Sequence, residues 1–168
     1  MAEWYAPFEP YAIQSTVTCL AMAKASESKR ILEVACGSGV HSEFIAKNYL
    51  QEGALLVSCD FSNSMVEMLK AQYDKSVFTK MPDCKFSCDL ETDFVSNENA
   101  VAELPQPALK ERQVFGCMAD NMRLPFASES FDCYISNMSM MIVPDYKKQI
   151  HECFRVLKKG SFACFTVW

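Results

Sequence analysis

The chain of 168 residues is long enough for one α/β domain with a buried core, and too short for two domains of ordinary size. Of its residues 50% are apolar and the net charge is −5, which excludes the polybasic surface that binds nucleic acids or anionic membranes. We therefore expect a single domain over residues 1–168 and no nucleic-acid partner.

The sequence also lacks targeting and metal-binding patterns. No apolar stretch approaches the ~20 residues that a membrane-spanning helix needs, so no membrane span is expected. The start, MAEWYAPFEP, resembles neither a secretory signal nor a transit peptide. Nine cysteines without a C-x-x-C pair, together with only two histidines, argue against a zinc site and for a reducing compartment. These features predict a soluble, cytoplasmic protein without a metal.

Apolar runs alternate with amphipathic segments along the chain. The first amphipathic segment, residues 11–25, predicts a leading helix. The strands expected after it are 30–35, 54–60, 113–120, 131–137 and 161–168, and the helices are 40–50, 62–73 and 145–160. Continuous apolar runs are typical of parallel strands covered on both faces. We therefore expect a three-layer, Rossmann-like α/β fold, with a mostly parallel sheet between helices.

The helix expected over 145–160 carries an apolar side and a stop signal. Its spacing places four residues on one side of the helix, namely Ile150, Cys153, Phe154 and Leu157. Gly160 is expected to end the helix, since glycine is common just past a helix C-terminus.

A long segment, residues 74–112, separates the second crossover helix from the third expected strand. A loop of about 40 residues inside a compact domain is usually functional or disordered. From Cys88 to Leu109 it contains five carboxylates and neither lysine nor arginine. We expect a mobile insertion with a short helix near 97–104, and a partner-binding role stays open.

Ligands of parallel sheets bind beyond the carboxyl ends of the strands, where this sequence places glycines and polar residues. Gly37 and Gly39 follow the first expected strand, where glycines let the backbone approach a ligand at a helix N-terminus. Asp60 ends the second strand, 21 residues past Gly39, at a distance where a carboxylate can accept both hydroxyls of a ribose. The later strands end in Asp120, Asn121 and Asn137.

Glu33 separates the two cofactor classes that use this arrangement. A carboxylate beside the glycine turn repels a pyrophosphate and attracts an ammonium group. The dinucleotide fingerprint also requires a third glycine, and Ser42 occupies that position. The sequence therefore favours a cationic, phosphate-free nucleoside over the NAD(P) of a reductase.

Four segments follow one another along the chain, namely Glu33–Gly39, Asp60–Met65, Asp120–Phe126 and Arg155–Gly160. Together they resemble the motifs of the class I S-adenosylmethionine-dependent methyltransferases of the small-molecule type, which includes quinone-biosynthesis enzymes. The resemblance runs from about Arg30 to the last residue. Four motifs in the family's order make a specific signal, whereas each motif alone is weak.

The resemblance implies which residues bind S-adenosyl-L-methionine. The backbone of Gly37 and Gly39 would contact the methionine part of the cofactor, and Glu33 would favour its ammonium group. Asp60, which Phe61 follows, would accept both ribose hydroxyls.

The remaining cofactor-binding residues follow from the same resemblance. Asp120 would accept a hydrogen bond from the adenine amine, and the amide of Asn121 would donate to the ring. Asn137 would line the methyl-transfer site. Ala35 replaces the family's first glycine, which we expect to be a modest change at a strand end. No catalytic base is assigned, because methyl transfer mainly requires alignment of the nucleophile.

Each of these residues also has a purely structural interpretation. Glu33 could cap or pair within the fold, Asp60 could be a helix N-cap, Asp120 a turn residue and Asn137 a strand-end cap. The occurrence of all four at successive strand ends favours the cofactor site.

The fold expected from this sequence is truncated after its fifth strand, whereas the family's sheet continues. Residues 161–168 would form an exposed apolar edge, which is an association hazard. The chain could be a fragment of a longer protein, its edge could be covered by a second copy or a partner, or it could be a degenerate, noncatalytic protein. We favour the first explanation. The expected function is methyl transfer to a small-molecule or lipid-like acceptor, and the alternative is a noncatalytic subunit that acts in assembly or binding.

Overall fold

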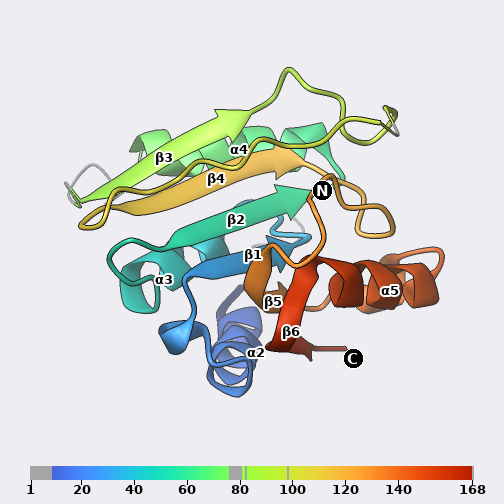
Figure 1. Cartoon of the computed structure of the whole chain (residues 1–168), viewed down its shortest axis with the longest axis horizontal. Helices are drawn as coiled ribbons and strands as arrows, with labels where there is room; N and C mark the ends of the chain where they lie inside the picture. Colours follow the sequence, from blue (N-terminus) through green and yellow to red (C-terminus); the bar gives the residue numbers. More distant parts are fainter. Residues whose placement is uncertain (1–8, 76–80, 82, 98, 168) are drawn as a thin grey trace.

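Six parallel strands form one sheet in the computed structural model, which describes residues 9–75, 81, 83–97 and 99–167. The strands are β1 (Arg30–Val34), β2 (Leu55–Asp60), β3 (Cys84–Asp89), β4 (Arg112–Met118), β5 (Phe131–Ser136) and β6 (Leu157–Phe165). Their order across the sheet is β3-β4-β2-β1-β5-β6, and every neighbouring pair is parallel (Figure 1). The expected parallel α/β fold is confirmed.

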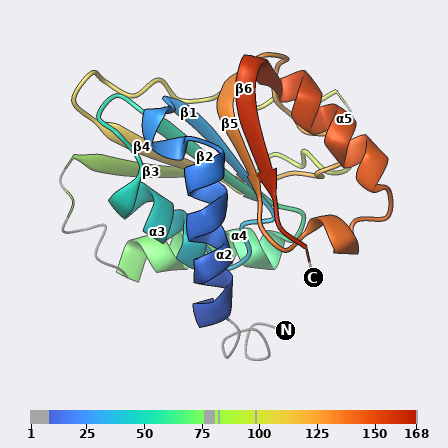
Figure 2. The ribbon, with the colours of Figure 1, turned by 90° about the horizontal axis from the view of Figure 1, so that it is seen from below.

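Helices cover both faces of this sheet (Figure 2). They are α2 (Glu9–Met22), α3 (Val40–Asn48), α4 (Asn63–Lys75) and α5 (Tyr146–Val156), with the 3-10 helices η2 (Ala25–Glu27) and η4 (Met140–Ile142). On one face, Leu20 of α2, Ile45 of α3 and Leu69 of α4 share one buried cluster. On the other face, Cys153 and Val156 of α5 join a second cluster. Within the described residues, no helix is long and apolar enough to cross a membrane.

The segment 74–112, predicted to be a mobile insertion, contributes a strand that the sequence analysis missed. β3 lies at the outer edge of the sheet and pairs with β4 alone. Its side chains alternate between more and less exposed positions, with Lys85 exposed and Phe86 partly buried. This alternation is typical of an edge strand, whereas the continuous apolar runs used to find the other strands are absent.

The helix predicted near residues 97–104 is wrong, because none of the described residues in that range is helical. Side-chain oxygens of Asp93 and Asn97 instead accept backbone N–H groups two or three residues further on, which is typical of turns. Ala102 is buried, and its N–H donates to the carbonyl oxygen of Pro125 at 2.7 Å. This part of the insertion is therefore attached to the segment that follows β4.

The last helix ends four residues earlier than predicted, so that Gly160 does not stop it. α5 ends at Val156, and Leu157 has the extended backbone angles φ −79° and ψ 139° that begin β6. Gly160, with φ 81°, lies in the irregular start of β6, where the pairing with β5 shifts register.

The apolar side predicted for this helix is confirmed for Cys153 and Leu157, which pack in or against the buried cluster, and wrong for Ile150 and Phe154. Ile150 is 43% exposed and Phe154 is 85% exposed, whereas the buried side contains Gln149 and Cys153. The buried amide of Gln149 donates to the hydroxyl of Tyr134 at 3.3 Å. A polar residue therefore occupies a core position that hydropathy assigns to apolar side chains.

β6 is the outer strand on the opposite edge from β3, as the sequence predicts for the last strand. Most of its residues are exposed or half-buried, and Phe162 is 42% exposed. The expected exposed apolar edge is present in the described chain.

Candidate functional site

The turn after β1 holds three residues in the left-handed backbone region, namely Ala35 (φ 53°), Gly37 (φ 57°) and Gly39 (φ 87°). The N–H of Cys36 donates to the carbonyl of Cys59 at 3.0 Å, and the N–H of Gly39 donates to the carbonyl of Cys36 at 3.2 Å. Helix α3 begins directly after this turn. The turn therefore presents backbone at a helix N-terminus, on the carboxyl edge of the sheet.

The two glycines of the turn have different roles. A side chain added at Gly37 would meet nothing within 4 Å, so open space adjoins this residue. A Cβ added at Gly39 would lie 2.3 Å from Cδ1 and 3.1 Å from Cα of Leu69 on α4. Gly37 therefore leaves room for a ligand, whereas Gly39 allows α4 to pack closely against the turn.

Ala35 is strained, which corrects the expectation that an alanine is a modest change there. Its φ of 53° lies in the region where a Cβ costs roughly 1–2 kcal/mol. We expect Ala35→Gly to raise the free energy of unfolding by about 0.5–1 kcal/mol, because the relief exceeds the entropy cost of glycine. Urea unfolding followed by circular dichroism checks this value, and a loss of stability would contradict it. Ala46→Gly, in the middle of α3, is the control and should destabilise the chain by about 1 kcal/mol or more.

Glu33 is buried between β1, β2 and α3. Its side chain is only 2% exposed, and Oε2 accepts hydrogen bonds from Ser42 Oγ at 2.5 Å and Ser58 Oγ at 2.9 Å. Ser58 is the register partner of Glu33 on β2. Burial raises the pKa of Glu33 to about 7, the two serine hydroxyls oppose this shift, and the charge of Asp60 adds to it. Sequence reasoning did not identify either serine as a partner, because the contact depends on strand register.

Asp60, at the end of β2, is joined to the glycine turn. Its Oδ2 accepts the backbone N–H of Gly37 at 2.9 Å, and its Oδ1 accepts the N–H of Ser62 at 2.9 Å. Ser62, and not Asp60, is the residue before α4 whose carbonyl accepts the first helical bond. Burial raises the pKa of Asp60 above its ordinary value. Each carboxylate oxygen can accept a further bond, so the side chain can still bind two hydroxyls. The adjacent Phe61 is 61% exposed.

Asp120 and Asn121 follow β4. Oδ1 of Asp120 accepts the N–H of Met122 at 2.8 Å, which is a turn contact. Asn121 is only 6% exposed, and its Oδ1 has no hydrogen-bond partner in the described structure. A buried carbonyl oxygen without a partner is costly, which makes this atom a candidate for ligand binding.

The segment after Asn121 is fixed by α5. Arg155 donates to the carbonyl oxygens of Phe126 at 2.6 Å and Leu124 at 2.9 Å, and Glu152 accepts the N–H of Leu124 at 2.6 Å. Arg155 and Glu152 also form an ion pair at 2.7 Å. Two of the four sequence motifs, 120–126 and 155–160, are thereby joined.

Asn137, directly after β5, connects several elements. Its Oδ1 accepts from the hydroxyls of Ser15 at 2.8 Å and Thr166 at 2.5 Å, and its Nδ2 donates to Thr16 Oγ1 at 2.9 Å. Through Ser15 and Thr166, this oxygen connects α2 with the residue that follows β6, although the single hydroxyl hydrogen of Ser15 is shared with the carbonyl oxygen of Ala12.

The polar residues predicted from the sequence meet at one edge of the sheet, in the order β4, β2, β1, β5. Among the described residues, Glu33, Asp60 and Asp120 form no ion pair, and no cluster of three metal-ligating side chains occurs. The open space at Gly37 and the unpartnered oxygen of Asn121 fit a phosphate-free nucleoside with a cationic group. The carboxylates would repel a pyrophosphate.

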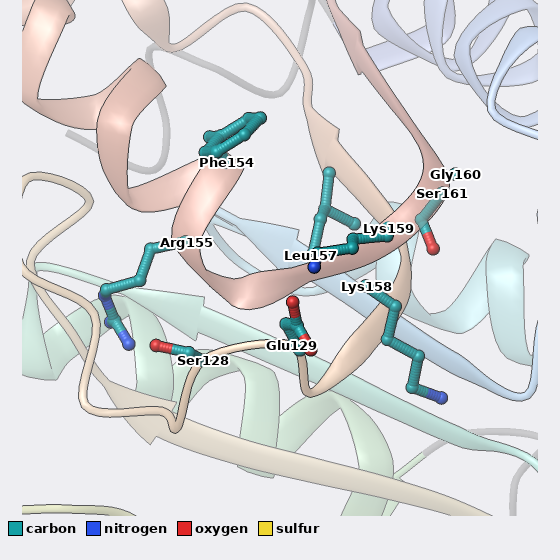
Figure 3. A pocket seen from close by; sticks show the side chains of 9 residues that line it. All are labelled: Ser128, Glu129, Phe154, Arg155, Leu157, Lys158, Lys159, Gly160 and Ser161. Carbon is teal, nitrogen blue, oxygen red and sulfur yellow. The ribbon is translucent and has the colours of Figure 1, made fainter.

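A separate cavity of about 500 Å³ lies at the other end of the strands, beside the amino ends of β5 and β6 (Figure 3). It is lined by Ser128, Glu129, Phe154, Arg155, Leu157, Lys158, Lys159, Gly160 and Ser161. Lys158 is paired with Asp132, and Arg155 is paired with Glu152. None of the strand-end residues contributes to this cavity, so the candidate site is the carboxyl edge.

Comparison with known proteins shows which family the chain resembles. A family model described as a methyltransferase domain matches residues 32–165. The chain is 25% identical over 133 residues to a demethylmenaquinone methyltransferase of Corynebacterium glutamicum, covering 79% of this chain and 39% of that protein. It is 24% identical over 141 residues to one of Streptomyces griseus, covering 84% and 43%. The chain therefore spans less than half the length of these curated relatives.

A solved structure shares the fold. The [4+2]-cyclase SpnF superposes with a TM-score of 0.64 at 18% identity, over 92% of this chain and 44% of that protein. At this identity the likeness concerns the fold alone.

Proposed function

Because the chain belongs to the methyltransferase domain family, whose methyl donor is S-adenosylmethionine, we propose that it transfers a methyl group from this cofactor to a small-molecule acceptor. The observation that carries the proposal is that three carboxylates without an ion pair among the described residues, Asp120, Asp60 and Glu33, lie at or near the carboxyl ends of β4, β2 and β1, beside the open glycine turn. The adenine amine and the ribose hydroxyls of such a cofactor need hydrogen-bond acceptors, and its cationic amino-acid part needs negative charge.

We assign the parts of the cofactor to the residues in that order. Asp120 and the buried Asn121 would bind the adenine, with the exposed ring of Phe61 as an apolar neighbour. Asp60 would accept the ribose hydroxyls while it holds the N–H of Gly37.

The methionine part of the cofactor belongs at the glycine turn. Gly37 and Gly39 would bring backbone N–H groups to it, with Ala35 at the start of the turn. Glu33, when ionised, would attract the ammonium group, because it stands on β1 two residues before the turn begins.

When bound, S-adenosylmethionine supplies an activated methyl group on a sulfonium ion, so the protein needs to align the acceptor more than to activate it. Alignment alone supplies about 7–11 kcal/mol in favourable cases. The chain contributes to it through rigid supports, since Asn137 fixes α2 and Arg155 fixes the segment after β4.

The acceptor is a small or lipid-like molecule in this proposal. The relatives from C. glutamicum and S. griseus are named for methylation of demethylmenaquinone. A hydroxylated aromatic ring, the reduced form of such a quinone, is therefore the acceptor class that we would test first.

A noncatalytic role in assembly or binding is the second candidate. The exposed edge of β6, where Phe162 is 42% exposed, favours it, because a second copy or a partner could cover this strand. The match with a cyclase also illustrates that this fold hosts other activities. Cofactor binding without methyl transfer to any acceptor tested would favour this role.

Calorimetric titration tests the cofactor site. We expect the chain to bind S-adenosylmethionine and S-adenosylhomocysteine with micromolar affinity and NADH not at all. Asp60→Asn should weaken binding of both by about 100-fold, or ~3 kcal/mol, because the bonds to the ribose hydroxyls lose their charge.

Asp74→Asn is the control for this experiment, since Asp74 lies exposed on α4 and is paired with Lys70. It should bind the cofactor like the original chain. Equal affinities in Asp60→Asn and Asp74→Asn, or tight binding of NADH, would contradict the proposed site.

A further inference from the structure

His41 lies at the point where three elements of the candidate site meet. It is the second residue of α3, half-buried, directly after the glycine turn. Its Nδ1 lies 3.3 Å from Nδ2 of Asn137, which follows β5. The same Nδ2 donates to Thr16 on α2. The ring is therefore joined to the end of β5 directly and to the leading helix through Asn137.

The contacts of Asn137 determine which ring nitrogen of His41 carries the hydrogen. Thr166 Oγ1 accepts the N–H of Met138, so its own hydrogen is directed to Asn137 at the atom assigned as oxygen. The other terminal atom of Asn137 is then the amide nitrogen, which lies 2.9 Å from Thr16 Oγ1 and 3.3 Å from both the carbonyl oxygen of Ala12 and Nδ1 of His41. An amide nitrogen does not accept a hydrogen bond, so it can only be the donor in its contact with His41. Nδ1 is thus an acceptor, and Nε2 carries the ring hydrogen.

Nε2–H of His41 is available to a ligand. Within the described part of the chain, no hydrogen bond involves this atom. Burial lowers the pKa of His41 below its ordinary value of 6.5, which favours the neutral ring at pH 7. A neutral, half-buried N–H group in a fixed orientation is suited to bind an oxygen atom.

The order of the strand ends indicates which molecule this group would meet. If β4, β2 and β1 bind the adenine, ribose and methionine parts, the next strand end is that of β5. His41 stands between the turn after β1 and Asn137 after β5. It therefore borders the methionine end of the site, where the methyl group is transferred.

We propose that His41 is a specificity-determining residue of the acceptor site, whose Nε2–H binds an oxygen of a hydroxylated aromatic acceptor. The inference rests on the proposed function and names its acceptor class. A phenolate or hydroxyl oxygen accepts this hydrogen bond, whereas an ammonium group cannot. His41 keeps its own hydrogen throughout, so no proton passes through the ring.

Nuclear magnetic resonance of the chain labelled with 15N-histidine tests this role. The chain contains only two histidines, and His151 is exposed on α5, which makes it an internal control. We expect the His41 spectrum of a neutral ring protonated at Nε2. Adding 1,4-dihydroxynaphthalene to the chain saturated with S-adenosylhomocysteine, without oxygen, should shift the Nε2 signal of His41 and leave His151 unchanged.

Two variants separate hydrogen bonding from packing. His41→Phe keeps a ring without a donor and should weaken binding of the naphthalenediol about tenfold, whereas His41→Gln keeps an N–H and should stay within about threefold. Both variants should bind S-adenosylhomocysteine like the original chain, which shows that the site is intact.

The outcomes distinguish this inference from the proposed function. Equal binding of the diol by the original chain and His41→Phe, or an unchanged His41 signal, would overturn the role of His41. A chain that binds S-adenosylhomocysteine but not the diol would overturn it too, and would leave the cofactor site standing. A chain that does not bind S-adenosylhomocysteine would overturn the proposed function itself.

Discussion

Gly39→Ala is expected to lower the free energy of unfolding by about 3 kcal/mol or more. The new methyl group would lie 2.3 Å from Cδ1 and 3.1 Å from Cα of Leu69, a fully buried residue of α4. Rotation of the leucine would relieve only the first contact. The backbone at φ 87° adds strain for any residue with a Cβ. Urea unfolding followed by circular dichroism measures the change.

Gly37→Ala is the matched control for this prediction. It adds the same methyl group two residues earlier, at φ 57°, but into open space. We expect a loss of only about 1–2 kcal/mol from backbone strain. Equal losses in both variants would contradict the packing role of Gly39. Because the methyl group of Gly37→Ala fills the candidate ligand space, this folded variant should also bind S-adenosylhomocysteine more weakly.

The sequence was sufficient to predict the central strands and the polar residues that meet at their carboxyl ends. β1, β2, β4 and β5 are covered on both faces, so their apolar runs are continuous and easy to recognise. The resemblance to methyltransferases drawn from four motifs is confirmed by the family match over residues 32–165. Strand-end acids could be found because a parallel sheet brings all its carboxyl ends to one edge.

The outer elements could not be predicted, because there local pattern and tertiary packing disagree. β3 has polar residues at alternate positions and no covered second face, so its segment looked like a loop. In α5, Ile150 and Phe154 have the spacing of a buried stripe, yet the sheet contacts Gln149 and Cys153. A buried glutamine is stable there because its amide donates to Tyr134 and to Ser136.

Which side chains contact each other within the site depends on strand register, and hydropathy does not reveal the register. Ser58 faces Glu33 because the two residues are paired across β1 and β2. Asn137 meets His41 because β5 lies beside β1. Each contact joins segments far apart in the chain, so it appears only when the order and offset of the strands are known.

Protein stability should fall as the pH rises from about 4.5 to 7, in part because of Glu33. Burial raises the pKa of this carboxyl group from 4.5 to about 7, so between these values the folded chain binds a proton that the unfolded chain has lost. Stability then decreases with pH across this window, by about 3 kcal/mol in total, and is constant with respect to Glu33 above pH 7.

Glu33→Gln isolates this contribution. The amide does not titrate, so the difference in unfolding free energy between the variant and the original chain should shift by about 3 kcal/mol in favour of the variant from pH 4.5 to 7.5. Urea unfolding at several pH values measures it. Glu67→Gln, at an exposed position of α4, should follow the original chain at every pH. A constant difference between Glu33→Gln and the original chain would contradict the raised pKa.

Cofactor binding should have the opposite dependence on pH. Only the ionised carboxylate of Glu33 attracts an ammonium group, so the affinity for S-adenosylhomocysteine should rise by about tenfold from pH 6 to 7.5, with release of a proton. Calorimetry in two buffers of different ionisation enthalpy measures both effects. Glu33→Gln should bind more weakly at pH 7.5 and show no dependence on pH in this range.

A second ligand identifies the group that Glu33 recognises. 5′-Methylthioadenosine carries the adenine and ribose but no amino-acid part, so its affinity should be nearly equal in the original chain and Glu33→Gln and should not change from pH 6 to 7.5. The same pH dependence for both ligands would mean that Glu33 acts through the turn that it supports, by way of Ser42 and Ser58, and not by attracting the ammonium group. A carboxylate buried this deeply, with Asp60 close enough to raise its pKa further, ionises in the chain alone only near pH 7. The cationic end of the proposed cofactor would stabilise the ionised form, which would account for an acid before a turn that is open to a ligand.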